Sequence, residues 1–358
     1  MRIQPESVII RSSYRIIDAL KKLNRPGSFS KTLFVTDNSD KLIGSLTDGD
    51  IRRAFINGFT TESTVDEVCQ KPPVFAFQNT SDEQIDLLTQ GKKIFSLPII
   101  DEQGKITRIL KTGEDGSEDG EGLAIIMAGG EGMRLRPLTE NIPKPMLKVG
   151  NKPILQILIE SLRDSGYTEI LINIRYLSGI ITDYFKDGSD FNVKIDYITE
   201  PKPMGTAGSL GIIPPELRPD SSFLVINGDL LTTLNFKSFR DFHDTAGYDF
   251  TLCGRPYKVK IPFGYPVIEG DIVTAFREKP EFTHFVNSGI YCISPELLDK
   301  VPENKYFDMP DLIQVAIENQ KRVGVFPLRE VFHEVGRPET YENAEEFYNN
   351  HLNNSKAI

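Results

Sequence analysis

The 358-residue chain carries a formal net charge of −10, with 39% hydrophobic and 26% charged residues. That acidic balance argues against a nucleic-acid surface or an anionic membrane as partner, and no apolar stretch suits a signal peptide or a membrane span. Three scattered cysteines and four dispersed histidines predict no disulfide framework and no zinc site, so we expect a cytoplasmic protein. The length of the chain is enough for two or more domains.

Residues 1–111 read as two copies of one unit, at 7–60 and 63–111. Both copies carry a helical pattern, then a strand that reaches a turn, then a second strand. The matching segments are 17–20 with 85–88, 33–37 with 97–101, and 41–46 with 105–110. This order resembles a tandem pair of CBS motifs. The resemblance implies either a cleft for an adenine nucleotide such as AMP or ATP, or a structural or dimerising module.

The first copy keeps the segment GSLTDGD at 44–50, which resembles the nucleotide end of a CBS motif. The resemblance implies that Thr47 contacts a phosphate and that Asp50 contacts the ribose. Asp50 is also a suitable N-cap for a helix beginning at Ile51, and capping alone would explain it. The second copy has lost these residues, so we expect one competent cleft at most: Arg108, Lys111 and Glu114 take the positions of Gly44, Thr47 and Asp50.

Residues 112–122, TGEDGSEDGEG, are acidic, rich in glycine and without apolar residues, which predicts a linker. From residue 123 onwards, short apolar strands alternate with helical patterns. The predicted strands are 123–127, 170–174, 193–198 and 223–226, and the predicted helices include 154–162 and 180–185. This alternation predicts a Rossmann-like α/β domain at 123–358, with a mostly parallel sheet and helices on both faces.

The first of these strands ends in a glycine-rich loop. Gly129, Gly130 and Gly132 let the backbone bend sharply and bring its N–H groups close to a ligand. Two cations follow at once, Arg134 and Arg136, and a third, Lys144, is held between prolines. Donors and fixed positive charge together suit a triphosphate, although the spacing is that of neither a P-loop nor a dinucleotide-binding G-x-G-x-x-G.

The longer run at 129–146, GGEGMRLRPLTENIPKPM, resembles the signature of the sugar-1-phosphate nucleotidyltransferases, G-G-x-G-T-R-L-x-P-L-T followed by P-K-P. Met133 stands where that family usually has Thr or Ser, which costs a hydroxyl contact to phosphate but leaves the backbone donors. The resemblance implies a domain of the GT-A type. It also implies roles for the run: catalytic cations Arg134 and Lys144, and nucleotide-binding residues Ala128, Gly129, Gly130 and Gly132.

A second segment that resembles this family follows the predicted strand 193–198. It contains Gly205-Thr206-Ala207, in which Gly205 permits a close approach of the backbone to the nucleotide. We expect Thr206 to cap the next helix. Five residues before Gly205, where the family places a side chain against the nucleobase, this chain has Glu200.

Glu200 favours GTP as the nucleotide. An ionised carboxylate only accepts hydrogen bonds, and guanine presents two adjacent donors, N1–H and the N2 amine. Uracil and thymine present one donor between two acceptors, and family members that use them often carry Gln at this position. Discrimination by a carboxylate at such a site is worth about 2–5 kcal/mol. The alternative is that Glu200 is a solvated loop acid.

The predicted strand 223–226 leads to Asp229, at the edge where open parallel sheets bind ligands. We interpret Asp229 as a Mg²⁺ ligand beside the triphosphate, with a turn-capping Asp as the alternative. The family often supplies a second carboxylate from W-x-D-I-G. Here the corresponding segment is FHEVG at 332–336, so Glu334 replaces the Asp, and the chain has no Trp.

Three further segments resemble the family's sugar-phosphate site. In PFGY at 262–265, Gly264 gives room for a sugar ring. In REKP at 277–280, the resemblance assigns Glu278 to the sugar hydroxyls and Lys279 to the sugar phosphate, as a third catalytic cation. In NSGIY at 287–291, Asn287 is the sugar contact. An adjacent Glu–Lys pair at a strand edge is otherwise a solvated surface.

The resemblance covers nearly the whole chain and is strongest to the CBS-containing guanylyltransferases, a group that includes the glucosamine-1-phosphate guanylyltransferases of legionaminic acid biosynthesis. It implies Mg²⁺-dependent transfer from GTP to a hexose 1-phosphate, with glucosamine 1-phosphate favoured. The alternatives are a mannose-1-phosphate guanylyltransferase, a glucose-1-phosphate uridylyl- or thymidylyltransferase, and a catalytically impaired nucleotide-sensing subunit, which Met133 and Glu334 favour. Adenine-nucleotide regulation and association into a homo-oligomer are further expectations from the CBS pair.

Overall fold

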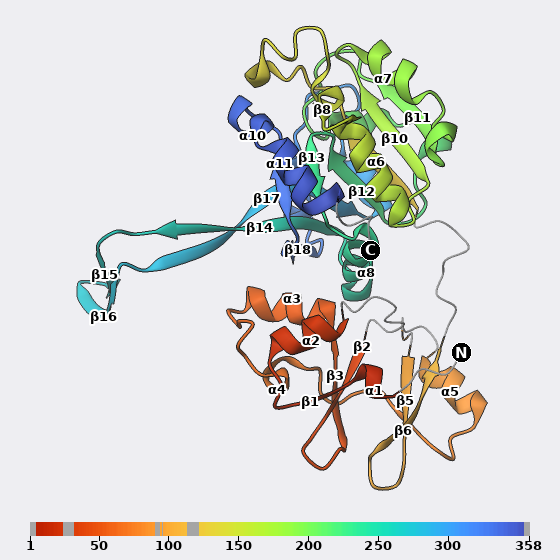
Figure 1. Ribbon diagram of the computed structural model, residues 1–358, viewed down its shortest axis with the longest axis vertical. Helices are drawn as coiled ribbons and strands as arrows, with labels where there is room; N and C mark the ends of the chain where they lie inside the picture. The colour runs from red at the N-terminus through yellow and green to blue at the C-terminus, as the bar shows by residue number, and fades with distance from the viewer. Residues whose placement is uncertain (1–4, 24–31, 90–93, 95, 113–121, 354–358) are drawn as a thin grey trace. The chain divides into compact units, whose positions relative to one another are not determined.

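The computed structural model describes residues 5–23, 32–89, 94, 96–112 and 122–353 (Figure 1). It divides into two compact units, Met1–Ser117 and Glu118–Ile358. Of the predicted linker, residues 113–121 lie outside the described residues, and so does Glu114. None of the described helices is long and apolar enough to span a membrane.

The N-terminal unit contains two small sheets of the same topology. Its elements are α1 (Pro5–Val8), β1 (Ile9–Arg11), α2 (Ile16–Leu23), β2 (Thr32–Thr36), β3 (Leu42–Thr47), α3 (Asp48–Ile56), α4 (Val65–Val68), β4 (Ala76–Phe77), α5 (Asp82–Thr89), β5 (Ser96–Ile100) and β6 (Ile106–Lys111). The first strand of each sheet runs parallel to the second, and the second pairs antiparallel with the third. The two predicted hairpins are confirmed by the registers Leu33↔Leu46 and Leu97↔Leu110.

The two copies share details beyond topology. A register shift falls at Val35/Thr36 in one hairpin and at Ile99/Ile100 in the other. In each turn an aspartate, Asp37 or Asp101, accepts hydrogen bonds of 2.8–2.9 Å from the backbone N–H groups two and four residues later. The two turns also contact each other, because the N–H of Leu42 donates to the carbonyl of Gly104 at 2.9 Å. The N-terminal unit is therefore a structural repeat whose copies pack together.

The C-terminal unit is built on a seven-stranded sheet in the order β11-β10-β7-β12-β17-β14-β18. These strands are β7 (Leu123–Met127), β10 (Glu169–Ile174), β11 (Lys194–Thr199), β12 (Phe223–Asn227), β14 (Phe250–Lys260), β17 (Glu281–Ile293) and β18 (Val323–Pro327). Strands β7, β10, β11 and β12 are parallel, whereas β17 runs antiparallel to both of its neighbours. The predicted α/β fold with a mostly parallel sheet is confirmed.

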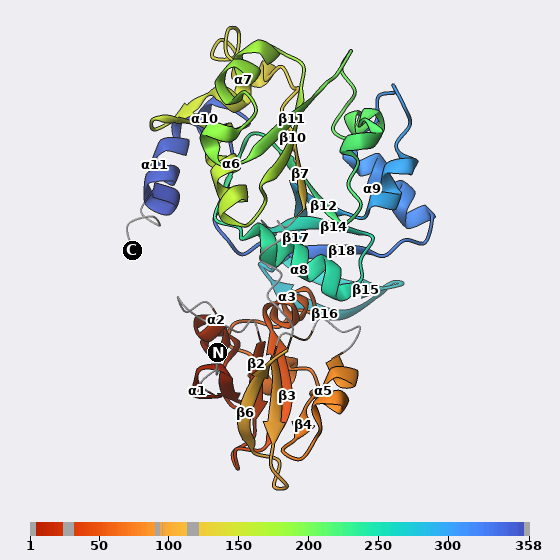
Figure 2. The ribbon, with the colours of Figure 1, turned by 90° about the vertical axis from the view of Figure 1, so that its right-hand side faces the viewer.

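Helices cover both faces of this sheet (Figure 2). They are α6 (Ile154–Asp164), α7 (Ser178–Phe185), α8 (Phe236–Ala246) and α9 (Met309–Glu318). Alternate residues of β7 face opposite cores: Ala124 and Ile126 pack with α6, α7 and α8, whereas Ile125 packs with α9. A strand that is buried on both faces has no polar side, which explains the continuous apolar run in the sequence.

A separate apolar cluster holds the loop that follows β7. Leu135 and Leu147 pack in it with Ile154 of α6 and with Val335 near the C-terminal end. The remaining elements are β8 (Lys148–Val149), β9 (Lys152–Pro153), β13 (Leu230–Thr232), β19 (Phe332–Glu334), α10 (Pro338–Glu342), α11 (Ala344–Tyr348), and the short 3-10 or π turns Met133–Leu135, Lys144–Met146, Ser189–Phe191, Gly208–Ile212, Pro215–Leu217, Pro295–Lys300 and Asn349–Asn353.

Strands β14 and β17 continue beyond the sheet as a two-stranded ribbon (Figure 1). Their pairing runs from Gly254↔Asn287 outward to Lys260↔Glu281. The tip of the ribbon is a hairpin of β15 (Gly264–Glu269) and β16 (Ile272–Glu278). At about 3.3 Å per residue, the stretch from Gly254 to Lys260 alone carries the tip roughly 20 Å from the sheet.

A contact between two loops positions the segment after β11. The backbone N–H and the hydroxyl of Thr206 donate to Asp308 Oδ1 at 2.9 and 3.1 Å, and Thr206 Oγ1 accepts from the N–H of Met309 at 2.8 Å. Asp308 is the N-cap of α9. The prediction that Thr206 caps the following helix is therefore wrong: the next turn, Gly208–Ile212, has no side-chain cap, and Thr206 binds the start of α9 instead.

The same contact sets the protonation state of Asp308. Burial raises the pKa of this carboxyl, but hydrogen bonds from the Thr206 backbone, the Tyr306 hydroxyl and the Thr206 hydroxyl outweigh burial, so the pKa lies below its ordinary value. A carboxyl whose pKa is lowered on folding contributes stability above its unfolded pKa and loses that contribution as the pH falls through the folded value.

We expect Asp308→Ala to lower the free energy of unfolding by about 1–2 kcal/mol at neutral pH, because α9 loses its N-cap and Thr206 loses its acceptor. The difference from the wild type should be complete above the ordinary pKa of an aspartate, about 4, and should shrink as the pH falls from there through the lowered pKa of Asp308. Urea unfolding at a series of pH values measures this difference. Asp299→Ala, at a side chain that is 71% exposed, is the control. A difference that does not change with pH would contradict the role of the charge.

Candidate active site

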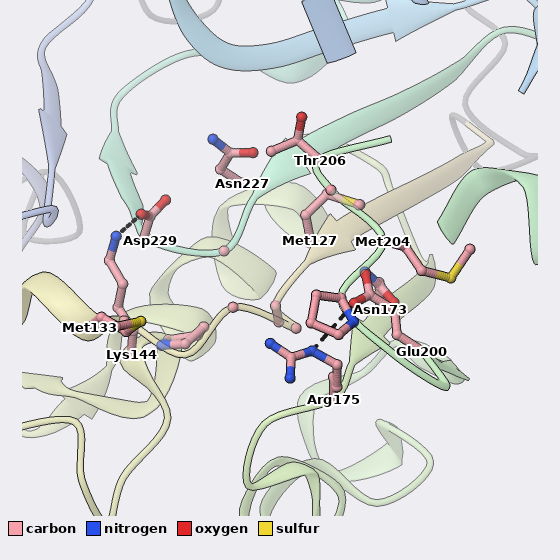
Figure 3. Close-up of a pocket in the computed structure, with 18 of the residues that line it drawn as sticks. Met127, Met133, Lys144, Asn173, Arg175, Glu200, Met204, Thr206, Asn227 and Asp229 are labelled. Carbon is pink, nitrogen blue, oxygen red and sulfur yellow. Dashed lines mark hydrogen bonds and ion pairs between the residues drawn. The ribbon is translucent and has the colours of Figure 1, made fainter. Parts of the chain in front are cut away.

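A cavity of about 450 Å³ lies where the parallel strands of the C-terminal sheet end (Figure 3). Most of its lining comes from the end of β10 and from the segments that follow β7, β11 and β12, and Tyr306 and Gly336 complete it. This is the edge at which open α/β sheets bind ligands. Ten of the predicted site residues line the cavity: Ala128, Gly129, Gly130, Gly132, Arg134, Lys144, Glu200, Gly205, Thr206 and Asp229.

Gly132 and Gly130 of the glycine loop have different structural roles. Gly132 has a φ of +61°, and a Cβ there would lie 3.0 Å from Lys144 Cβ and 3.1 Å from a methyl carbon of Thr139. A larger residue would be strained and would push the Lys144 segment away. At Gly130, by contrast, a Cβ would meet nothing within 4 Å. Gly132 therefore serves packing, whereas Gly130 leaves its backbone open to the cavity.

Arg134 and Lys144, the cations of the loop that the resemblance assigns to catalysis, have different surroundings. Arg134 is exposed and makes no ion pair with any described residue, while its neighbour Leu135 is buried and anchors the turn. Lys144 forms an ion pair with Asp229 Oδ2, and the side chains of the pair are only 13% and 15% exposed. Met133, at the position where the family usually has a hydroxyl, also lines the cavity and is 65% exposed.

The surroundings of Asp229 fit a divalent cation. Asp229 Oδ1 is buried and has no hydrogen-bond partner in the described part of the chain. Strand β19 places Glu334 opposite Leu230, and the next N–H, that of Val335, donates to the carbonyl of Asp229 at 3.0 Å. Glu334 itself is exposed and is not among the lining residues. Because Mg²⁺ is usually held by one or two carboxylates together with substrate phosphates, Asp229 with Glu334 nearby suits Mg²⁺.

Glu200 lies at the other end of the cavity from the Lys144–Asp229 pair (Figure 3). It is only 7% exposed, so the alternative of a solvated loop acid is wrong. A Cβ at Gly129 would lie 3.3 Å from the Glu200 carboxyl group, which shows how closely the loop backbone approaches it. The glycine loop and Glu200 therefore form adjacent walls of one space.

Two polar residues beside Glu200 were missed by the sequence analysis. Asn173 donates from Nδ2 to Glu200 Oε1 at 2.6 Å, and Arg175 Nε lies 3.6 Å from Glu200 Oε2. Both line the cavity. The sequence did hold a signal: in strand β10, EILINI, Asn173 is a polar residue inside an apolar run and falls next to the carboxyl end.

The residues assigned to the sugar phosphate are not brought together with this cavity. Gly264 and Glu278 are paired across the hairpin at the ribbon tip, and Lys279 follows at once with a φ of +46°. None of the three is a lining residue. In this structure the predicted sugar subsite is therefore divided, because three of its members lie on the ribbon.

Asn287 lies closer, at the base of the ribbon. Its Nδ2 donates to the Tyr291 hydroxyl at 2.7 Å, and its Oδ1 accepts from the N–H of Gly289 at 3.1 Å. A Cβ at Gly289 would lie 2.4 Å from Asn227 Nδ2, and Asn227 lines the cavity. Burial raises the pKa of Tyr291, so this phenol stays a neutral partner. Gly289 thus lies between Asn287 and the lining residue Asn227.

In the N-terminal unit, Thr47 and Asp50 bind each other. Thr47 is the N-cap of α3, and Asp50 Oδ2 accepts from its N–H at 2.8 Å and from its hydroxyl at 2.6 Å. Asp50 Oδ1 accepts from Arg53 at 2.6 Å and from Gln70 at 3.0 Å. The interpretation of Asp50 as the N-cap of a helix at Ile51 is therefore wrong, because the helix begins at Asp48 and Asp50 is its third residue.

Comparison with known proteins identifies two families. A nucleotidyl transferase model matches residues 123–351, and a CBS domain model matches residues 3–57. Among curated relatives, the mannose-1-phosphate guanyltransferase of Kluyveromyces lactis is 34% identical over 237 residues, which is 64% of this chain and 65% of that protein, just under two thirds of its length. The UTP–glucose-1-phosphate uridylyltransferase of Synechocystis sp. is 34% identical over 205 residues, 52% of each protein.

Among solved structures, HddC from Yersinia pseudotuberculosis is 30% identical with a TM-score of 0.50, covering 63% of this chain and 99% of HddC. A second HddC structure, complexed with GMP-PN, is 29% identical with the same TM-score and coverage. The matched region includes every residue of the cavity. Because the nucleotidyl transferase model matches well over half of the chain, the chain belongs to the nucleotidyl transferase family and carries a CBS domain ahead of its transferase domain.

Proposed function

We propose that this chain transfers a guanylyl group from GTP to a hexose 1-phosphate and releases pyrophosphate, with glucosamine 1-phosphate as the favoured acceptor. The cavity carries the proposal: a glycine loop, Arg134, the largely buried Lys144–Asp229 ion pair and a buried Glu200 line one space at the carboxyl ends of parallel strands. The relatives support nucleotidyl transfer to a sugar 1-phosphate, and the HddC complex with GMP-PN supports a guanine nucleotide.

The chemistry asks little of the protein beyond position and charge. An oxygen of the sugar phosphate attacks the α-phosphorus of GTP in line, and the bond to the pyrophosphate leaving group breaks. The attacking oxygen is already an anion, so no general base is required. The loop backbone at 129–132 orients the triphosphate, and Arg134 and Lys144 neutralise the charge that develops. Mg²⁺ held by Asp229, with Glu334 nearby, would add positive charge at the phosphates.

The choice of GTP rests on Glu200. A buried carboxylate matches adjacent donors on a base edge and repels acceptors, and Glu200 is buried beside the loop. The choice of acceptor sugar rests on the resemblance. Mannose 1-phosphate with GTP, and glucose 1-phosphate with UTP or dTTP, are the alternative substrate pairs, and the curated relatives include proteins named for two of these activities.

A catalytically impaired nucleotide sensor is the second candidate. Met133 supports it, because this side chain takes the place of a hydroxyl in the cavity lining. The retained Arg134, Lys144 and Asp229 favour the enzyme, since a sensor needs no leaving-group cation. Pyrophosphate release with any hexose 1-phosphate decides between the two.

For the N-terminal unit we propose a structural role over adenine-nucleotide binding. The oxygens of the buried Asp50 carboxylate already accept four hydrogen bonds from this chain. In addition, a Cβ at Gly44 would lie 2.8 Å from Cys69 Sγ, so the side-chain space beside this glycine is filled. AMP or ATP would have to displace these contacts. Association through this unit into a homo-oligomer remains a prediction from the resemblance.

We expect Arg134→Ala or Lys144→Ala to lower kcat by at least about 100-fold, because each removes a cation from the phosphate end of the cavity. Pyrophosphate release with Mg²⁺, GTP and a panel of hexose 1-phosphates measures the effect. Arg136→Ala and Lys148→Ala are matched controls, since both side chains are exposed and lie outside the lining. Near-normal turnover of either cavity variant, with its circular dichroism unchanged, would sink the mechanism.

We expect the wild type to use GTP at least about 30-fold better than UTP, judged by kcat/KM, because Glu200 repels the uracil carbonyls. Glu200→Gln should reduce that ratio by at least about 10-fold, since an amide both donates and accepts. Glu216→Gln, an exposed acid in the turn Pro215–Leu217, serves as control. A wild type that prefers UTP or dTTP would keep the enzyme class and refute the role of Glu200.

Lys279 offers a test of whether the ribbon contributes to the sugar site. If Lys279 binds the sugar phosphate as the resemblance implies, Lys279→Ala should raise the KM for hexose 1-phosphate about 10-fold or more, because a charge-assisted hydrogen bond is lost. The KM for GTP should not change. Lys260→Ala, on the same ribbon, is the matched control. Equal KM values in the two variants would mean that the ribbon tip takes no part in sugar binding.

A further inference from the structure

Three side chains form a row at the end of the cavity opposite Lys144 and Asp229 (Figure 3). The Glu200 carboxylate lies in the middle, with Arg175 Nε 3.6 Å from Oε2 on one side and Asn173 Nδ2 2.6 Å from Oε1 on the other. The row is held from outside the cavity as well, because Arg175 also donates to Glu131 at 3.2 Å. Figure 3 shows Asn173, Arg175 and Glu200 gathered together, away from Lys144 and Asp229.

Two buried polar atoms of this row have no hydrogen-bond partner in the described part of the chain. Asn173 is 1% exposed, yet its Oδ1 has no hydrogen-bond partner, and Arg175 Nε is likewise buried without one. Buried polar atoms without partners are rare in folded proteins, because each has lost its hydration without a replacement. Both residues line the cavity, so a ligand bound there would lie next to the side chains that carry these atoms.

The orientation of the Asn173 amide follows from its contact with Glu200. The atom 2.6 Å from Glu200 Oε1 must be the donating nitrogen, because an oxygen in that place would repel the carboxylate. The amide oxygen is therefore the atom left over. Read from Arg175 through Glu200 to Asn173, the row presents a donor, then an acceptor, then a second acceptor.

We propose that Arg175, Glu200 and Asn173 together read the Watson–Crick edge of guanine, with Asn173 as the residue that recognises the N2 amine; this inference rests on the proposed function. Guanine presents O6 as acceptor, then N1–H and the N2 amine as donors, which complements the row at every position. Uracil and thymine end in an acceptor, O2, that would face the Asn173 oxygen and Glu200 Oε1 beside it, so both residues repel these bases. Adenine and cytosine present an amine to Arg175 and a ring nitrogen acceptor to Glu200.

ITP isolates the Asn173 contact, since inosine keeps O6 and N1–H and lacks only the N2 amine. We expect the full-length wild type, titrated calorimetrically in Mg²⁺, to bind GTP at least about 10-fold more tightly than ITP. Asn173→Ala should bring that ratio to within about 2-fold by weakening GTP. Arg175→Ala should weaken GTP and ITP alike and leave the ratio unchanged, because both nucleotides carry O6.

The GTP/ITP affinity ratio distinguishes recognition of the N2 amine by Asn173 from a role of Asn173 in holding Glu200 in place. If Asn173 only held Glu200 in place, Asn173→Ala would weaken both nucleotides equally and the GTP/ITP ratio would stay at its wild-type value, which overturns the proposal. Gln314→Ala removes a matched amide–carboxylate contact, 2.9 Å to Glu318 on the exposed side of α9, and should change neither affinity.

The wild type alone also tests the inference, so the result does not depend on any variant folding. Equal affinity for GTP and ITP, with UTP weaker than both, would overturn the reading by Asn173 while the proposed guanylyl transfer stands. A wild type that binds UTP in preference to GTP would overturn both the reading and the proposed nucleotide.

Discussion

The ion pair between Lys144 and Asp229 joins segments that are 85 residues apart and thereby shapes the cavity. One partner follows the glycine loop and the other follows β12. Both side chains are largely buried, so the loss of either would leave an uncompensated charge, which costs more than the pair gains. The surrounding chain meets this constraint. Gly132 has no side chain that would clash with Lys144, and Leu135 and Leu147 hold the loop in an apolar cluster.

The parallel strands then separate the two ends of the cavity. Strand β12 leads to Asp229 at one end of the cavity, while β10 and β11 lead to Asn173 and Glu200 at the other; we propose these ends for the phosphates and the base. Because the order of strands is β11-β10-β7-β12, the glycine loop after β7 lies between these ends. A nucleotide laid along the sheet edge would thus cross the loop backbone between its base and its phosphates. The linear arrangement comes from strand order and not from any one side chain.

Local patterns in the sequence sufficed for much of this architecture. The apolar run at 123–127, the glycines and the prolines around Lys144 each specify their own conformation, so the strand, the loop and the cation could be predicted. Contacts across the chain could not. Thr206 looked like a cap for its own helix, yet it binds Asp308, about one hundred residues later. Similarly, no local pattern reveals that β14 and β17 stay paired beyond the sheet and carry Lys279 away from the cavity.

The ribbon has a further consequence for how this chain can vary. A register shift between Leu252 and Gly254 separates the part of β14 that belongs to the sheet from the part that forms the ribbon. No residue of the ribbon beyond this shift belongs to either large core of the C-terminal unit. Substitutions in the hairpin of β15 and β16 at the ribbon tip therefore remove no member of those two cores. Natural selection can therefore change what the hairpin touches independently of the stability of the fold.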